Sequence, residues 1–166
     1  MKEKTVDESK LLIVQQMVQA DANLAGNVHG GVIMKLIDST AGLVAVRHAL
    51  SNVVTASIDR LDFHTPVFVG ELLVVNAAIN YTGTSSMEVG VRVEAENVMT
   101  GERRHTASAY LTFVALDNDG KPTAIPPLAI NSEEEKRRNR EAAERRKIRL
   151  NERSRENKLR RDSNHS

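Results

Sequence analysis

The longest apolar segment of the chain sets the strongest constraint on its fold. Between Val32 and Leu50, large apolar side chains recur around most of a helical circumference. This pattern predicts a helix of about 20 residues, roughly 30 Å long. A helix that is apolar on every side is a buried helix. The rest of the chain must therefore supply a surface that surrounds it.

The segments on either side of this helix have the alternation that is typical of β-strands. One short β-branched segment precedes the helix, and four longer ones follow it, separated mostly by short turns. The five segments are residues 10–18, 53–59, 72–81, 87–98 and 103–117. Short hairpin connections indicate antiparallel pairing. One antiparallel sheet and one apolar helix have a simple packing solution, in which the sheet wraps around the helix.

This arrangement is the hot-dog fold, and it belongs to the α+β class. The sequence therefore predicts an antiparallel five-stranded sheet wrapped around a long central helix. An open five-stranded sheet has two unpaired edges, and such an edge commonly pairs with a second copy of the chain. We accordingly expect at least a homodimer.

Charge divides the chain into a body and a tail. Residues 1–132 carry 10 Lys and Arg against 14 Asp and Glu, a net charge of −4, whereas residues 133–166 carry 13 against 8, a net charge of +5. We predict a single hot-dog domain at 1–131 and a charged tail at 132–166. Ser132 and Glu135 have the spacing of a capping box, so the tail is expected to be helical. Because it has few large apolar side chains, we expect a solvated or partly frayed helix.

A carboxylate within the apolar helix is the first candidate functional group. Small residues share the helical face of Asp38, so another chain or a ligand could approach it closely. An isolated buried carboxylate is costly, and Asp38 should therefore have hydrogen-bond partners or line a wet cleft. The pattern alone is equally compatible with a structural and a catalytic role.

Paired glycines at the start of the same helix add a second candidate group. The first amides of a helix have no partner within it and carry the positive end of its dipole. Since Gly30 and Gly31 lack a Cβ, a substrate oxygen could reach those amides, as in an oxyanion hole. The alternative is an ordinary glycine-rich helix start capped by Asn27. His29 is expected to serve as a packing or polar residue of the first turn.

Residues 21–38 resemble the signature of the hot-dog acyl-CoA thioesterases, the acyl-CoA hydrolase family that includes a brain-type cytosolic enzyme and bacterial relatives. The resemblance rests on an Asn before paired glycines and on an acidic residue within the following helix. It continues through residues 53–73, 83–97 and 106–122, and covers roughly residues 8–125.

The resemblance implies hydrolysis of acyl-CoA thioesters to a free carboxylic acid and CoA. It implies that Asn27 and Asp38 form the catalytic site across a homodimer interface, with the amides of Gly30 and Gly31 as the oxyanion hole. Asp38 would act as a general base or as a nucleophile, and the sequence leaves this choice open. No metal and no cofactor are expected, since CoA is part of the substrate and product. Family members often assemble as a trimer of dimers.

The CoA moiety requires contacts of its own. In the family, the turn between the third and fourth strands approaches the pantetheine and nucleotide, and here that turn is residues 82–86. Relatives often carry a basic residue where this chain has Thr84, so backbone and hydroxyl groups would have to serve instead. A plain hairpin turn is the alternative. The candidate CoA contacts are Gly83, Ser85, Ser86, Arg60, Arg103 and Arg104.

Other function classes are compatible with parts of the sequence. A hot-dog dehydratase or hydratase would place a His beside the helix, which fits Asn27 and Asp38 less well. A non-catalytic acyl-CoA-binding sensor stays open. The basic tail could contact nucleic acid, but eight acids are interleaved in it and it has no aromatic residue to stack on bases.

Composition sets the expected compartment. The chain has no Cys, which excludes disulfides and thiolate metal sites, and its five scattered His predict no metal cluster. The N-terminus contains acidic residues and only a four-residue apolar run, so it is not expected to be a signal peptide. No apolar run approaches the roughly 20 residues of a membrane helix. We expect a cytoplasmic protein with no membrane or nucleic-acid partner.

Overall fold

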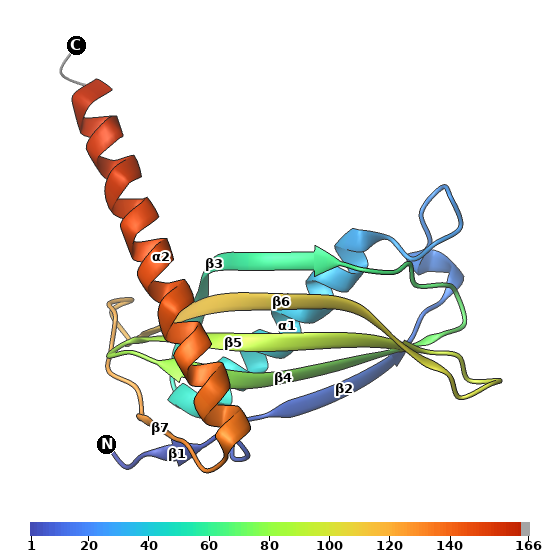
Figure 1. Ribbon diagram of the computed structural model, residues 1–166, viewed down its shortest axis with the longest axis horizontal. Helices are drawn as coiled ribbons and strands as arrows, with labels where there is room; N and C mark the ends of the chain where they lie inside the picture. Colours follow the sequence, from blue (N-terminus) through green and yellow to red (C-terminus); the bar gives the residue numbers. More distant parts are fainter. Residues whose placement is uncertain (164–166) are drawn as a thin grey trace.

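The computed structural model describes residues 1–163 and has a five-stranded sheet with a helix on each face (Figure 1). Strands β2 to β6 form one antiparallel sheet in the order β2-β4-β5-β6-β3, and the short β1 and β7 pair in parallel. The predicted α+β hot-dog fold is confirmed. The elements are β1 (Lys4–Thr5), β2 (Leu11–Gln16), a 3-10 turn (Gln19–Asp21), α1 (Gly30–Ala49), β3 (Asn52–Phe63), β4 (Leu72–Thr82), β5 (Ser86–Glu96), β6 (Arg103–Leu116), β7 (Leu128–Ala129) and α2 (Glu133–Ser163).

The core lies between α1 and one face of the sheet. Alternate residues of β5 and β6, among them Val91, Val93, Ala107 and Ala109, point into it and are at most 4% exposed. Small side chains on β6 let the helix lie close to the strands. The helix begins two residues earlier than predicted, at Gly30, and ends where Leu50 adopts a left-handed conformation, φ 55°.

The prediction that α1 is buried on all sides is wrong for a single copy of the chain. Ile37 and Val44 face the sheet and are at most 1% exposed, but Leu43 and Val46 on the opposite side are 52% and 43% exposed. Five strands cover only one side of a helix. The uncovered side is apolar, so the amphipathic signal expected of a surface helix is absent from the sequence.

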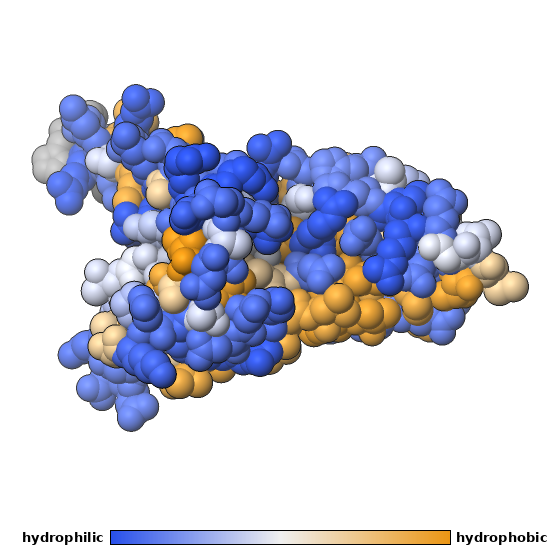
Figure 2. All heavy atoms as spheres, turned by 60° about the horizontal axis from the view of Figure 1, so that its bottom comes forward, coloured by the Kyte–Doolittle hydropathy of each residue, from blue (hydrophilic) through white to orange (hydrophobic). Residues whose placement is uncertain are grey.

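Apolar surface also continues on the neighbouring sheet edge. Leu12 and Val14 of β2 are 57% and 49% exposed. Figure 2, in which the β2 side comes forward, shows apolar surface gathered into one band beside charged surface. Among residues 1–163, the helices do not combine the length and apolar content that crossing a bilayer requires.

The prediction of a solvated tail is wrong for the first half of helix α2, which packs on the sheet. The predicted capping box is present, since Ser132 Oγ accepts from the Glu135 amide at 3.1 Å and Glu135 accepts from the Ser132 amide at 3.2 Å. The helix then crosses the face of the sheet opposite α1 (Figure 1), with Ala142 fully buried. Only residues 150–163 are exposed throughout, and they project beyond β3.

Ion pairs between α2 and the sheet explain why the tail appeared solvated in the sequence. Arg145 pairs with Glu88 of β5 at 2.7 Å, and Arg149 pairs with Asp59 of β3 at 2.7 Å. Glu88 lies on the face of β5 opposite α1, yet it is only 4% exposed because Arg145 of α2 covers it. A docking surface that uses charged side chains has no apolar periodicity by which it could be recognised.

Arg145→Ala is therefore expected to lower the free energy of unfolding by about 2 kcal/mol, because it leaves the buried Glu88 carboxylate without its cation. Thermal and urea unfolding measure the change. Arg153→Ala is the matched control, since Arg153 lies on the exposed part of α2, and it is expected to stay within about 0.5 kcal/mol of the wild type. Equal stability of the two variants would contradict the docking described here.

Candidate functional site

A tight loop precedes α1 and holds the predicted Asn27. The side-chain oxygen of Asn23 accepts hydrogen bonds from the amides of Ala25 at 2.9 Å and Asn27 at 3.2 Å. Gly26 has φ +85°, a conformation that favours glycine, and its amide bonds to the Asn23 carbonyl. The loop uses only the side-chain oxygen of Asn23. The side-chain nitrogen, Nδ2, therefore stays available as a donor toward a ligand.

The cap of α1 is His29 rather than Asn27. The His29 Nδ1 atom accepts from the Gly31 amide at 2.9 Å. The amide of Gly31 is thus engaged within the protein, whereas that of Gly30 takes no part in this cap. Of the two amides expected in an oxyanion hole, Gly30 is the one that a substrate could reach without displacing a bond.

A cavity of about 290 Å³ opens beside this helix start. Asn23, Asn27 and Gly30 line it together with Phe63 and His64, which come from the end of β3 and the loop after it. The ring of Phe63 lies 3.7 Å from the position that a Cβ on Gly30 would occupy. The structure thereby brings Asn27 and Gly30 together at one end of the sheet.

Asp38 lies elsewhere on α1 and is held by a residue that the sequence did not single out. The hydroxyl of Thr55, on β3, donates to Asp38 Oδ1 at 2.9 Å. Asp38 is half-buried. The bond from Thr55 confirms the expectation that its carboxylate has a hydrogen-bond partner. This bond uses one carboxylate oxygen. The other can accept a proton or attack an electrophile.

The two halves of the predicted site do not meet within one chain. Asp38 does not line the cavity at the helix start. It lies eight positions after Gly30 along the helix, a rise of about 12 Å. A single copy therefore carries an asparagine and amide half at one end of α1 and a carboxylate half near its middle.

The predicted CoA contacts are spread over the molecule. Gly83, Ser85 and Ser86 form the β4–β5 turn, at the opposite end of the sheet from the start of α1 (Figure 1). The Gly83 amide bonds to the Ser86 carbonyl at 2.7 Å. Arg60 and Arg103 form exposed pairs with acids of the sheet, Asp62 and Glu96. Such pairs are weak, so both guanidinium groups stay accessible to a phosphate.

Arg104 is bound more firmly than the other predicted cations. It donates to both carboxylate oxygens of Glu71, at 2.7 and 2.9 Å, and to the Pro66 carbonyl at 3.0 Å. The hydrogen bonds from Arg104 hold the pKa of Glu71 below its usual range, and those to Glu71 raise the pKa of Arg104. Arg104 thus ties the loop after β3 to the sheet and has little capacity left for a ligand.

Two polar residues beside the predicted groups, Asn23 and Thr55, are not distinguished by the sequence. The loop before α1 contains two asparagines, and nothing local to Asn23 sets it apart from Asn27. Thr55 is inconspicuous because a threonine is ordinary in a strand. The available signal was its position two residues after Val53, on the side of the strand that faces α1, since Val53 pairs with the buried Ala115 and Thr55 pairs with Phe113. Among residues 1–163, no group of three or more His, Asp or Glu side chains could hold a metal ion.

Comparisons with known proteins give consistent matches. Residues 25–102 match the family model described as the thioesterase superfamily. The chain is 41% identical over 128 residues to the Bacillus subtilis protein called uncharacterized acyl-CoA thioester hydrolase YkhA. The matched region covers 77% of this chain and 74% of the Bacillus subtilis protein. The chain is 40% identical over 136 residues to the cytosolic acyl coenzyme A thioester hydrolase of Rattus norvegicus, which covers 81% of this chain. That match spans only 36% of the rat protein.

Solved structures extend the likeness to the whole fold. An apo-hexameric acyl-CoA thioesterase has a TM-score of 0.88 at 39% identity, covering 92% of this chain and 97% of that one. The acyl-CoA hydrolase of Staphylococcus aureus, solved with butyryl coenzyme A and coenzyme A, has a TM-score of 0.88 at 36% identity, covering 95% and 96%. Three further structures of that hydrolase carry an alanine at an aspartate, at an asparagine 15 positions before it, or at a threonine 17 positions after it.

Proposed function

The chain belongs to the acyl-CoA thioester hydrolases of the thioesterase superfamily, and we propose that it hydrolyses acyl-CoA thioesters to a free carboxylic acid and CoA. The observation that carries the proposal is the half-buried carboxylate of Asp38, held by Thr55 with one oxygen left open. A helix whose covered and uncovered sides are both apolar has no structural need for such a group. Because several mammalian relatives are named cytosolic, we also propose a cytoplasmic location.

Spacing supports a specific set of catalytic residues. In the Staphylococcus aureus hydrolase, the substituted asparagine and threonine lie 15 positions before and 17 positions after the substituted aspartate. The same spacings around Asp38 in this chain select Asn23 and Thr55. Asn27, predicted from the sequence, lies 11 positions before Asp38 and remains the second candidate for the asparagine role.

The proposed reaction uses water and groups of this chain. Asp38 takes a proton from water as the water oxygen attacks the thioester carbon, and the Gly30 amide with the Asn23 side chain stabilises the developing oxyanion. Collapse of the tetrahedral intermediate breaks the carbon–sulfur bond, and the proton passes to the sulfur of CoA. Direct attack by Asp38, through a transient anhydride that water then opens, is the alternative route.

We propose that two copies complete the site. The 12-residue β3 is an open edge of the sheet, and its Val54 and Ile58 are each 42% exposed. Antiparallel pairing of two such edges would turn the second copy end for end and bring its helix start toward Asp38. The uncovered apolar side of α1 supports the same interface. Because similar thioesterases were solved as hexamers, we propose a trimer of such dimers.

The test is release of CoA from purified protein supplied with acyl-CoAs of C2 to C18. Since the chain has no Cys, a thiol reagent reports only the CoA that hydrolysis releases. We expect turnover above the buffer rate for at least one chain length. Tight binding of acyl-CoA without turnover of any chain length would favour the sensor alternative and overturn the proposal.

A further inference from the structure

The cavity at the start of α1 ends against the core of the protein. Val28, Ile33 and Val67 line it, are at most 5% exposed and belong to the hydrophobic core between α1 and the sheet. A CoA thioester has two arms of different kinds. The CoA arm must lead back to solvent because its nucleotide is large and charged, whereas the acyl arm ends at its last carbon. A cavity with an apolar inner wall therefore suits the acyl arm.

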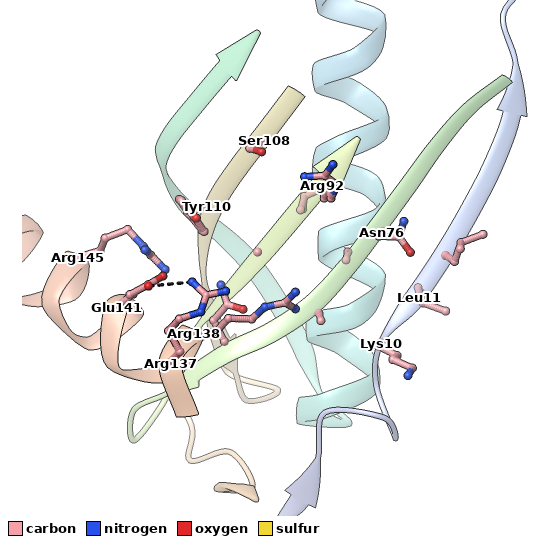
Figure 3. Close-up of a pocket in the computed structure, with 16 residues that line it drawn as sticks. Lys10, Leu11, Asn76, Arg92, Ser108, Tyr110, Arg137, Arg138, Glu141 and Arg145 are labelled. Carbon is pink, nitrogen blue, oxygen red and sulfur yellow. Dashed lines mark hydrogen bonds and ion pairs between the residues drawn. The ribbon is translucent and has the colours of Figure 1, made fainter. Parts of the chain in front are cut away.

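The size of this cavity suits a short acyl chain. Its volume of about 290 Å³ equals the liquid volume of about ten water molecules. A larger cavity, of about 690 Å³, lies between α2 and the outer face of strands β2, β4, β5 and β6 (Figure 3), and the sheet separates it from the helix start. Cationic side chains line that larger cavity, namely Lys10, Arg92, Arg137, Arg138 and Arg145. An acyl chain therefore fits better beside Gly30 than on the outer face.

One side chain gives the wall of the helix-start cavity an unusual polarity. Among the described residues that line it, there is no Asp or Glu, and His64 is the single one whose side chain can become charged. The start of α1, at Gly30, adds the positive end of the helix dipole. An anionic group inside this cavity would therefore meet no carboxylate that repels it.

His64 is fixed in position by its neighbours. Its amide donates to the Thr106 carbonyl of β6 at 2.8 Å, and its ring lies against the ring of His105, with the centroids 4.6 Å apart. His105 is fixed in turn, because its Nε2 atom lies 2.7 Å from Ser108 Oγ and 3.1 Å from the Ala107 carbonyl oxygen. A ring supported in this way can present a donor to a ligand with little loss of conformational entropy.

The ring nitrogens of His64 are free to bind a ligand. In the described part of the chain they have no hydrogen-bond partner, in contrast to Nε2 of His105. A neutral imidazole has one N–H donor, and a protonated one has two. A carboxylate that accepts such a bond gains a charge-assisted interaction, which is stronger than a bond between neutral groups.

We propose that the helix-start cavity holds the acyl group and that His64 selects acyl groups ending in a carboxylate, the CoA monothioesters of short dicarboxylic acids. This inference rests on the proposed hydrolysis of acyl-CoA. The thioester oxygen lies at Gly30 and Asn23, the methylene groups lie on the apolar wall, and the terminal carboxylate accepts from the His64 ring. An acyl group that ends in a methyl would cover the ring without offering it a partner, and sites with a hydrogen-bonding group discriminate against such analogues.

Steady-state kinetics with adipyl-CoA and hexanoyl-CoA test the proposal. Both acyl groups have six carbons, and they differ only in a terminal carboxylate or methyl. We expect the wild-type kcat/KM to be higher for adipyl-CoA, after subtraction of the buffer rate. His64→Phe keeps a ring beside His105 but has no donor, so it is expected to lower the adipyl-to-hexanoyl ratio of kcat/KM by at least about tenfold. His64→Gln keeps an N–H donor and should retain most of the ratio.

The ratio distinguishes a selective role of His64 from a structural one. A structural loss lowers both substrates alike, and melting temperatures verify that each variant folds. An unchanged ratio in His64→Phe overturns the proposal, and so does a wild-type protein that hydrolyses hexanoyl-CoA about tenfold better than adipyl-CoA. Turnover of neither substrate contradicts the proposed hydrolysis instead. Calorimetric Kd values of the two acyl-CoAs then decide the inference, since tighter adipyl-CoA binding that is lost in His64→Phe supports it and equal Kd values overturn it.

Discussion

Asp38→Ala is expected to lower acyl-CoA turnover by about 10²-fold or more, because it removes the general base or the nucleophile of the proposed reaction. The substitution deletes no core volume, and we expect the melting temperature to change little. Asp38→Asn is the sharper variant. An asparagine oxygen still accepts from the Thr55 hydroxyl, so the local hydrogen bond survives while the basic carboxylate is lost. Its kcat should fall as far as that of Asp38→Ala.

Variants at Thr55 and at Asp119 test whether the effect is specific to Asp38. Thr55→Val removes the hydroxyl that positions the carboxylate and should lower kcat by roughly tenfold, in line with the loss of one such hydrogen bond. Thr55→Ser keeps a hydroxyl and should retain most of the wild-type kcat. Asp119→Ala removes a carboxylate from the exposed turn after β6 and should leave kcat unchanged. Near-wild-type turnover in a folded Asp38→Asn protein would exclude Asp38 from catalysis. Retained acyl-CoA binding in that variant is the control for an intact site.

Asn23→Ala is expected to lower kcat by about 10²-fold, and Asn27→Ala by clearly less. Asn23 lies 15 positions before Asp38, the same spacing as the substituted asparagine and aspartate of the Staphylococcus aureus hydrolase. The loop also leaves the side-chain nitrogen of Asn23 free to donate to a ligand. Steady-state kinetics of both variants at saturating acyl-CoA measure the difference.

Loss of the Asn23 loop is the competing explanation, and Asn23→Asp separates the two. An aspartate keeps the side-chain oxygen that accepts from Ala25 and Asn27, so the loop is preserved. It lacks the amide donor. An Asn23→Asp protein as inactive as Asn23→Ala assigns the loss to the donor, whereas normal activity would assign the loss to the loop. A larger loss in Asn27→Ala than in Asn23→Ala would return the catalytic role to Asn27.

The main elements, their order along the chain and their antiparallel direction could be predicted from the sequence because they depend on local pattern. The strand neighbours could not, since β3 pairs with β6 rather than with β4, the next strand along the chain. Strand alternation, glycine-containing turns and one continuous apolar helix leave few ways to bury the apolar surface. Ends were less predictable. Strand β3 runs to Phe63, four residues beyond its predicted end, because its pairing with β6 continues to that residue. The residues of β3 alone do not indicate how far the partner strand extends beside them.

Asp38 was also recognisable in the sequence, because burying a carboxylate in an apolar helix costs free energy that no neighbouring residue of the helix offsets. Its partner was not. Thr55 is 17 residues away, and only the packing of β3 along α1 joins them. Likewise, only the folded loop shows that the Asn23 side-chain oxygen accepts from the Asn27 amide, and only the folded helix start shows that His29 accepts from the Gly31 amide.

What the sequence determined by itself is thus the fold, which follows from periodicity, and the position of one carboxylate in an apolar helix, which stands out because burying charge is costly. Tertiary structure alone decided the distances between groups. It separated Asp38 from the start of its own helix, and docked a charged tail on the sheet through Arg145 and Glu88. It also formed, from residues of five elements, a cavity between α2 and the outer face of β2, β4, β5 and β6. The physical reason is that ion pairs and hydrogen bonds between distant segments have no period in the sequence, whereas the burial of apolar surface does.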